Sequence, residues 1–168
     1  MALPLHVVLH EPEIPNNTGN IGRTCVATGA KLHIIKPMAF DTSEKALRRA
    51  GLDYWPRLNP TEHESFDDYM RNTAVRPDKL WLFTTRAHCP VWEAPIHPGH
   101  HLVFGKETSG LPAEILDRYP HRCVTLPMVE DERSLNLATV VCAALYEGLR
   151  QCAQRHQYLV CPRGKLRM

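Results

Sequence analysis

The sequence predicts an α/β domain built on a mainly parallel sheet. Short apolar runs alternate along the chain with segments of helical pattern, which is the order that parallel strands with crossover helices require. The length and composition agree, because 168 residues with 43% hydrophobic and 23% charged side chains suit one globular domain with its own core. A long apolar helix predicted near the C-terminus supplies the third observation.

The strands are predicted at short runs rich in Val, Leu and Ile, bounded by polar or turn residues. In chain order they cover 5–9, 31–35, 80–84, 101–104 and 122–126. The loop EPEIPNN follows the first of them, and its two prolines argue against regular structure there. The runs 80–84 and 101–104 have one polar residue each, at an end, and are otherwise apolar, as is typical of strands buried on both faces.

The helices are predicted between these strands and are delimited by capping residues. Asn17 or Thr18 caps the first, which ends at Gly29. Ser43 caps a short helix that stops at Gly51, and a further helix is predicted over 65–72. Pro112 then opens the segment AEILDRY, because proline is tolerated at the first position of a helix.

The last predicted helix has the strongest periodicity in the chain. Its apolar positions recur at helical spacing: Leu137, Val140, Val141, Ala144, Leu145, Leu149 and Cys152. Ala138, Cys142 and Ala143 widen this apolar face beyond an ordinary stripe. A helix that is apolar on more than one side needs two neighbours, so we expect part of it to contact a second subunit.

Charge and cysteine content limit the cellular setting. The formal net charge is only +2, but five basic residues and one acid lie from Glu147 onward, which is either a solvated end or an RNA-binding arm. The six cysteines are scattered and form no CxxC pair, and the sequence shows no signal peptide, which indicates a reduced, cytoplasmic protein. It also contains no long apolar run, so we expect it to bind no membrane. We expect one domain over 1–152 and a basic tail over 153–168.

The loop around 16–23 is the first candidate site. Gly19 and Gly22 permit close approach of another backbone, and a helix start attracts anions such as phosphate. Asn20 and Arg23 lie three residues apart and share a helix face, where an arginine can bind phosphate with two parallel hydrogen bonds. The spacing alone favours the alternative, a capping asparagine and a surface arginine.

Two later loops are the other candidates. Residues 104–112 follow a strand but do not form a phosphate-binding P-loop, because the required earlier glycine is His100 and Glu107 replaces the hydroxyl residue. This segment is either a ligand-cradling glycine turn or a plain connection. Residues 126–136 precede the long helix, where Ser134 or Asn136 either caps the helix or lines a cofactor pocket.

Metal-capable side chains gather between 88 and 101. They are His88, Cys89, His97, His100 and His101. Three prolines interrupt this string, and it lacks the tight pairs that zinc sites favour. We therefore expect no metal site.

Together the three loops resemble the SPOUT methyltransferases, in their TrmH-like branch. The segments EPEIPNNTGNIGRTC, LVFGKETSGLP and VTLPMVEDERSLNLATVVCAALYEGLR are similar to the three motifs of that family, in the same order. HIIKPMAF and ALRRAGLDYW resemble its members that methylate the 2′-hydroxyl of the wobble cytidine or uridine of tRNA. The match runs from about residue 5 to 150, although Asn16 replaces a common proline and residues 130–132 are unusually acidic.

The resemblance implies a fold, a cofactor and partners. The fold would be an α/β sheet whose C-terminal part forms a deep trefoil knot, in a homodimer built on the long helix. The cofactor would be S-adenosyl-L-methionine, and the RNA partner the anticodon stem-loop of tRNA. Position by position, the family's cofactor contacts fall on Phe83, Gly105, Leu126 and Ser134. Its catalytic position falls on Arg23, and its other polar motif positions on Asn17, Glu107, Ser134 and Asn136.

The chemistry of these residues narrows the mechanism. A guanidinium is a poor base because its pKa exceeds about 12, so we expect Arg23 to bind the neighbouring phosphate and stabilise the developing oxyanion. No metal is needed for such a transfer. Arg48, Arg49 and the basic tail are candidates for RNA contact or for solubilising charge. Two alternatives stay open: a non-catalytic RNA-binding dimer, and a nucleotide-dependent transferase that acts on a small molecule.

Overall fold

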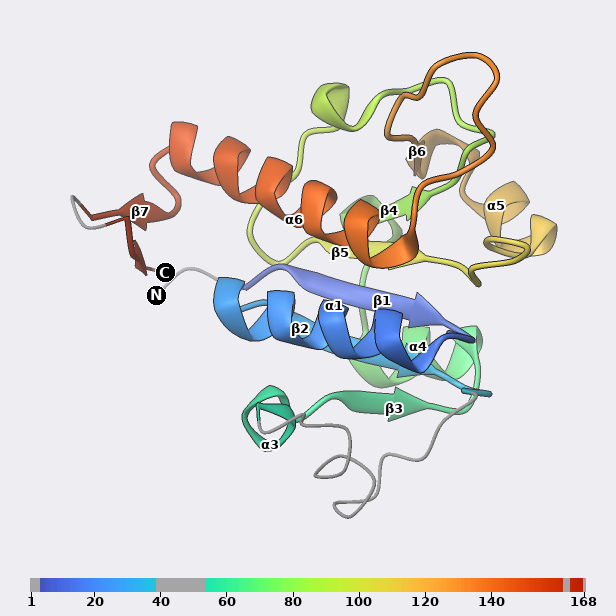
Figure 1. Ribbon diagram of the computed structural model, residues 1–168, viewed down its shortest axis with the longest axis horizontal. Helices are drawn as coiled ribbons and strands as arrows, with labels where there is room; N and C mark the ends of the chain where they lie inside the picture. The colour runs from blue at the N-terminus through green and yellow to red at the C-terminus, as the bar shows by residue number, and fades with distance from the viewer. Residues whose placement is uncertain (1–3, 39–53, 162–163, 168) are drawn as a thin grey trace.

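The computed structural model describes residues 4–38, 54–161 and 164–167. The helix predicted between Ser43 and Gly51 lies outside these residues, as do Arg48 and Arg49. Figure 1 shows a single sheet with helices on both of its faces and a short hairpin beyond the long C-terminal helix.

The sheet has six strands, all paired in parallel, in the order β3-β2-β1-β5-β4-β6. Their bounds are β1 His6–His10, β2 Lys31–Ile35, β3 Thr61–His63, β4 Leu80–Phe83, β5 His101–Phe104 and β6 Cys123–Val124. The predicted parallel sheet is confirmed. Only β3 was not predicted, because it has three residues, none of them aliphatic, and two are exposed at the sheet edge.

Two helical layers cover the sheet. Along β1, Val7 and Leu9 pack into the larger core cluster, beneath α1 (Pro15–Thr28), α3 (Trp55–Leu58) and α6 (Leu137–Gln154). Val8 points to the opposite face, which α4 (Phe66–Thr73) and α5 (Ala113–Arg118) cover. Strand side chains alternate between faces, so both must be apolar when both are covered.

Short elements complete the chain. Three single-turn 3₁₀ helices occupy Pro77–Lys79, Val91–Glu93 and Pro120–Arg122. The basic C-terminal segment forms an antiparallel hairpin of β7 (Leu159–Val160) and β8 (Leu166–Arg167). Sequence periodicity did not predict this hairpin, because its strands have only two residues each.

The first helix begins earlier than the capping pattern predicted. It starts at Pro15 rather than at residue 18, so the second proline of the EPEIPNN loop is helical. Proline fits there because its missing N–H has no partner within the helix, and its fixed φ suits the first turn. Ile14 precedes the helix and gives it no side-chain cap. The predicted end is confirmed: Gly29 takes a left-handed φ of 71°.

All six cysteines are free, and burial raises the pKa of the Cys25 thiol to about 12 and that of Cys152 to about 11. Within the described ranges, no helix combines the length and apolarity needed to cross a bilayer.

Candidate active site

A cleft of about 540 Å³ opens beyond the carboxyl ends of β4, β5 and β6. Ligands of open parallel sheets bind at this edge. The cleft is lined by seven of the residues that the sequence analysis selected: Asn17, Phe83, Gly105, Glu107, Leu126, Ser134 and Asn136. All three candidate loops therefore meet in one site, where Asn17 and Asn136, 119 positions apart, are hydrogen-bonded to each other.

The three loops are joined by a chain of hydrogen bonds through Asn17. Its side-chain amide donates to Oε1 of Glu107 at 3.1 Å, and its side-chain oxygen accepts from Nδ2 of Asn136 at 2.9 Å. Asn136 in turn caps α6, because its Oδ1 accepts from the N–H groups of Ala138 and Thr139. The capping role predicted for Asn136 is therefore correct. Asn17 does not cap its own helix but links the two other loops.

Glu107 caps α1 from a distant part of the sequence. Its carboxylate accepts from the backbone N–H groups of Glu13 at 2.8 Å and Ile14 at 3.1 Å. A carboxylate at this end of a helix also meets the positive end of the helix dipole. A reciprocal contact runs the other way, because the Glu13 carboxylate accepts from the N–H and hydroxyl of Thr108 at 3.1 and 2.8 Å. The first and second loops are thus clamped together at two points.

Replacing Glu107 with alanine should lower the free energy of unfolding by about 2–3 kcal/mol, since three hydrogen bonds to a charged acceptor are lost. For a chain of this size that corresponds to a fall of about 5–10 °C in the thermal midpoint. Differential scanning calorimetry measures it. Glu93→Ala, at an exposed carboxylate, is the matched control and should change stability by less than about 0.5 kcal/mol. Equal midpoints for the two variants would contradict the capping role.

Two stacked phenylalanine rings and the second loop, residues 104–112, determine the shape of the cleft. The rings of Phe83 and Phe104 stack with centroids 4.5 Å apart. Lys106 and Gly110 exchange backbone hydrogen bonds of 3.2 and 2.9 Å, so the chain reverses tightly over residues 106–110. A β-carbon on Gly105 would lie 2.0 Å from the backbone carbon of Gly110, and glycine is therefore required there. An aromatic floor with a polar rim is typical of a cofactor site.

Arg23 is the one predicted catalytic residue that does not line the cleft. It is exposed on α1, six positions after Asn17, which turns it away from the inward face of that helix. Its guanidinium carbon lies 5.5 Å from the centroid of the Tyr54 ring, and the Tyr54 hydroxyl donates to the carbonyl of Gly19. Asn20 is exposed as well, as the three-residue spacing predicted.

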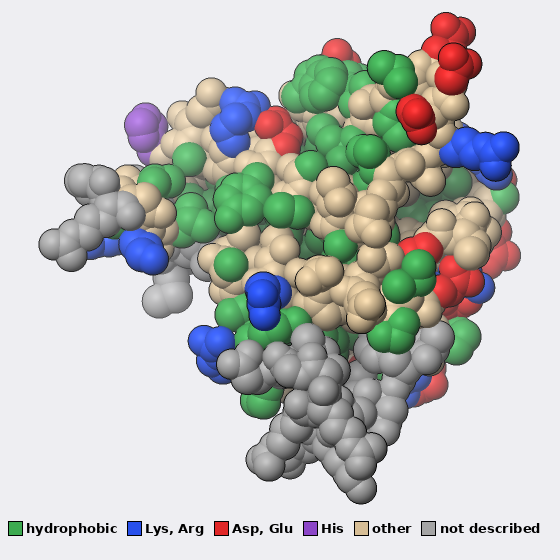
Figure 2. Space-filling model, viewed as in Figure 1, with side chains coloured by type: hydrophobic (Ala, Val, Ile, Leu, Met, Phe, Trp, Pro, Cys, Tyr) green, Lys and Arg blue, Asp and Glu red, His purple; other side chains and the backbone are tan. Residues whose placement is uncertain are grey.

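Other cleft residues were not selected from the sequence. Thr84, Thr85 and Arg86 follow β4 directly, and Arg133 belongs to the third loop. The rule that sites lie after strand ends would have found the first three. Figure 2 shows acidic side chains over the loop that follows β6, at the upper right, where the acidic residues 130–132 are all exposed.

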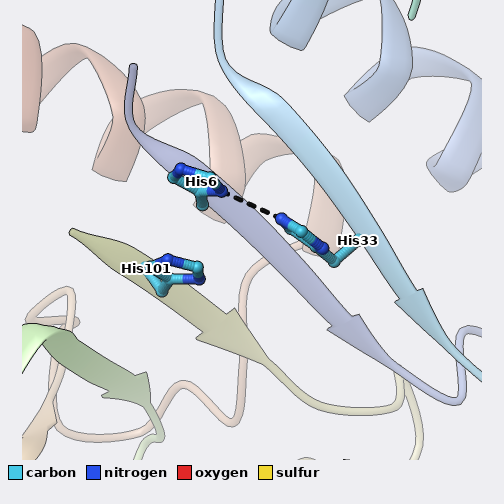
Figure 3. A group of neighbouring side chains, drawn as sticks. All are labelled: His6, His33 and His101. Carbon is cyan, nitrogen blue, oxygen red and sulfur yellow. Dashed lines mark hydrogen bonds between the residues drawn. The ribbon is translucent and has the colours of Figure 1, made fainter. Parts of the chain in front are cut away.

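The histidines between 88 and 101 do not form one group. His97 and His100 are in edge-on ring contact, and His100 accepts a hydrogen bond of 3.1 Å from the Trp81 indole. His101 instead lies on the face of the sheet that carries His6 and His33 (Figure 3).

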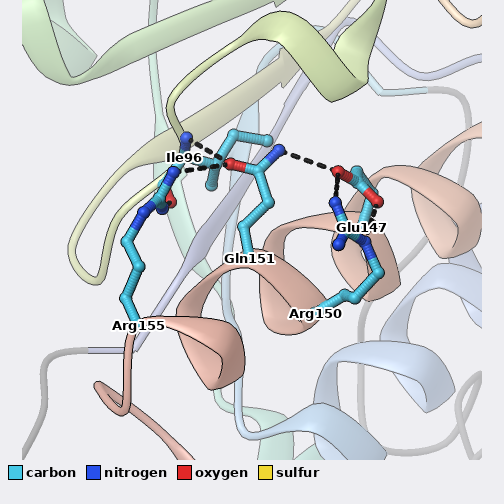
Figure 4. A network of polar contacts seen from close by, with 5 residues as sticks. All are labelled: Ile96, Glu147, Arg150, Gln151 and Arg155. Atoms are coloured by element: carbon cyan, nitrogen blue, oxygen red, sulfur yellow. Dashed lines mark hydrogen bonds and ion pairs between the residues drawn. The ribbon is translucent and has the colours of Figure 1, made fainter.

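Two of the basic residues considered for RNA contact have protein partners (Figure 4). Arg155 donates to the carbonyl of Ile96 at 2.7 Å and to the side chain of Gln151 at 3.3 Å. Arg150 pairs with Glu147 at 2.7 Å, and its hydrogen bonds hold the pKa of that carboxyl below its usual range. Arg150 bonds within α6, and Arg155 joins α6 to the segment before β5. Among the described basic residues of the tail, Lys165 and Arg167 therefore remain as candidates for RNA contact.

A doubly covered parallel sheet with a loop-lined cleft at its carboxyl edge is the architecture of an α/β protein that binds a ligand beyond its strand ends. The sequence profile of the SpoU rRNA Methylase family matches residues 4–146, and the chain belongs to that family. The resemblance to SPOUT methyltransferases is thus confirmed.

Several similar proteins are described as methyltransferases or in terms of RNA methylation. A tRNA (cytidine(34)-2′-O)-methyltransferase of Escherichia coli is 45% identical over 148 residues, which cover 88% of this chain and 93% of the relative. A solved structure on 2-OH methylation of C/U34 on tRNA is 41% identical with a TM-score of 0.81, covering 91% of this chain and 99% of the other. The SpoU methyltransferase AviRb of Streptomyces viridochromogenes, in complex with AdoMet, is 26% identical with a TM-score of 0.74, covering 92% of this chain and 62% of the other.

Proposed function

We propose that the protein transfers a methyl group from S-adenosyl-L-methionine to the ribose 2′-hydroxyl of nucleotide 34 of tRNA, a cytidine or uridine. One observation carries this proposal: the three loops meet at one cleft, where hydrogen bonds join Asn17 to Glu107 and to Asn136. The named relatives support the same reaction and the same nucleotide.

The cleft suits the cofactor in size and in chemistry. Phe83, Gly105, Leu126 and Ser134 line it and are the residues proposed to hold the cofactor. Bound S-adenosyl-L-methionine supplies a methyl group on a positively charged sulfur, which leaves as a neutral thioether. The loops position the reactants, and correct positioning alone contributes about 7–11 kcal/mol to lowering a barrier. Asn17, Glu107 and Asn136 hold those loops in register.

Arg23 is proposed to bind the phosphate beside the target ribose and to stabilise the oxyanion as the 2′-hydroxyl loses its proton. Its exposure suits a residue that meets a macromolecular substrate, and the Tyr54 ring supports its guanidinium. The proton leaves through phosphate, water or a neighbouring polar group. A guanidinium fits this role better than an ammonium because it presents a planar pair of donors.

A homodimer is proposed as the active form. The outward face of α6 has Thr139, Cys142, Ala143 and Tyr146 at helical spacing, and the Tyr146 side chain is 54% exposed. Ile14 and Leu135, at the rim of the cleft, are 45% and 46% exposed. Figure 2 shows hydrophobic side chains spread over this side of the molecule. A second copy docked there would bring the exposed Arg23 of one chain towards the cleft of the other.

The remaining proposals concern chain topology and RNA contact. Thr125 exchanges hydrogen bonds of 2.8 and 2.9 Å with the backbone of Val91 and Cys89, so the chain after β6 runs along the chain after β4 before it returns to α6. This course supports a trefoil knot in the C-terminal part.

We propose one catalytic domain over 1–152, with the basic tail over 153–168 contacting the anticodon stem-loop.

The test is transfer of labelled methyl from S-adenosyl-L-methionine to tRNA, with the product mapped by mass spectrometry. We expect a single 2′-O-methyl group at nucleotide 34, and RNA binding that weakens steeply with added salt. Methylation at another nucleotide would overturn the position assignment. Absence of transfer to total tRNA, together with absence of cofactor binding, would favour the non-catalytic dimer.

A further inference from the structure

Three histidines from adjacent parallel strands meet on one face of the sheet, at the end opposite the cleft (Figure 3). His6 and His101 are register partners on β1 and β5, and His33 lies diagonally across on β2, opposite Val8. The rings of His6 and His101 stack with centroids 4.0 Å apart. One ring nitrogen from each of the three residues lies within 4.8 Å of the others.

Neighbouring side chains orient these rings. Nδ1 of His6 and Nε2 of His33 are 2.9 Å apart, while the other nitrogen of His33 lies 3.1 Å from Nε2 of His63. The Tyr69 hydroxyl, on α4, lies 2.7 Å from Nδ1 of His101. Histidine ligands of metals characteristically donate their second ring N–H to an outer partner, which fixes the tautomer and the ring plane. His33 and His101 both have such a partner here.

The surroundings keep the three rings neutral. Burial lowers the pKa of His6 to about 4, of His33 to about 3 and of His101 to about 2. Neutral imidazole is the form that a metal ion binds. His33 and His101 are only 7% and 6% exposed, whereas His6 is half-buried and leaves a path to solvent.

The charged side chains near the three histidines determine how tightly a metal ion should bind. Lys31 and Lys79 are close enough to depress the histidine pKa values, and Asp68 acts only on His63. Two ammonium groups oppose a dication, so the affinity should fall below that of a site with a carboxylate ligand.

We propose that His6, His33 and His101 bind one divalent transition-metal ion, represented by Zn²⁺, through one ring nitrogen each. Three imidazoles and a water molecule are a ligand set that zinc accepts, whereas Mg²⁺ and Ca²⁺ require oxygen ligands. The ion cross-links the amino ends of β1 and β5 to the middle of β2 and takes no part in methyl transfer. This proposal departs from the absence of metal expected from the sequence.

The experiment uses the full-length, tag-free protein after dialysis against a chelator. Isothermal titration with Zn²⁺ is expected to give one site per chain, and bound Zn²⁺ to raise the thermal midpoint. His6→Gln removes a half-buried ligand and should weaken binding at least tenfold. His88→Gln is the matched control, because His88 is exposed and outside the group. No binding by the wild type, or equal binding by both variants, would overturn the proposal.

A second readout does not depend on the folding of the variants. X-ray absorption of the wild-type protein loaded with one equivalent of Zn²⁺ is expected to show three imidazole ligands at about 2.0–2.1 Å. A shell with one imidazole or none would identify adventitious surface binding and overturn the assignment. Neither measurement uses methyl transfer, so the outcome is independent of the proposed function.

Discussion

Replacing Arg23 with alanine is expected to lower the rate of methyl transfer to tRNA by about 10²–10³-fold, the usual cost of removing one donor to a developing oxyanion. Stability should hardly change, because Arg23 is exposed and its described contact is with the Tyr54 ring. Single-turnover transfer of labelled methyl measures the effect on the chemical step. Cofactor affinity, measured by calorimetry, should be unchanged because Arg23 does not line the cleft.

Two further variants separate charge from geometry. Arg23→Lys retains the charge but loses the planar pair of donors, so we expect most of the activity to be lost as well. Arg71→Ala removes an exposed arginine of α4 that pairs with Asp68 at 3.4 Å, and it should retain nearly wild-type activity. Full activity of Arg23→Ala would remove this residue from the mechanism. An equal loss in Arg71→Ala would point instead to general electrostatic attraction of RNA.

Alanine at Gly105 is expected to displace the second loop and to abolish measurable cofactor binding. The added β-carbon would lie 2.0 Å from the carbon and 2.4 Å from the oxygen of Gly110, and 2.1 Å from the nitrogen of Leu111. These are backbone atoms, so no side-chain rotation relieves the clash. We expect a loss of about 3–5 kcal/mol in the free energy of unfolding, at the upper end for overpacking. Chemical denaturation measures it, and calorimetry with S-adenosyl-homocysteine measures the pocket.

Gly110→Ala is the matched control within the same turn. Its φ is +70°, but no atom lies within 4 Å of the position of an added β-carbon. Only backbone strain remains, which costs about 1–2 kcal/mol. Cofactor affinity should therefore fall much less than in Gly105→Ala. If both variants behave alike, the close approach of Gly105 to residues 110 and 111 does not shape the cleft.

Much of the fold could be predicted from local patterns. The strands at 31–35 and 101–104 match the structure at both ends, because each run is too short for a typical helix and is bounded by turn residues. Gly29 ends α1 as predicted, since a left-handed residue stops a helix whatever surrounds it. The three selected loops do meet at the cleft, and strand ends and glycine turns are visible in the sequence.

The sequence by itself determined the α/β class, five of the six strands of the described sheet and the loops that form the cleft. The tertiary structure alone decided which side chains meet. Asn17 was one of two residues predicted to cap its own helix, but it bonds to Glu107 and Asn136. His101 faces His6 and His33 rather than His97. Local patterns report the backbone conformation of neighbours in sequence, whereas these contacts depend on strand order and register, which bring distant residues together.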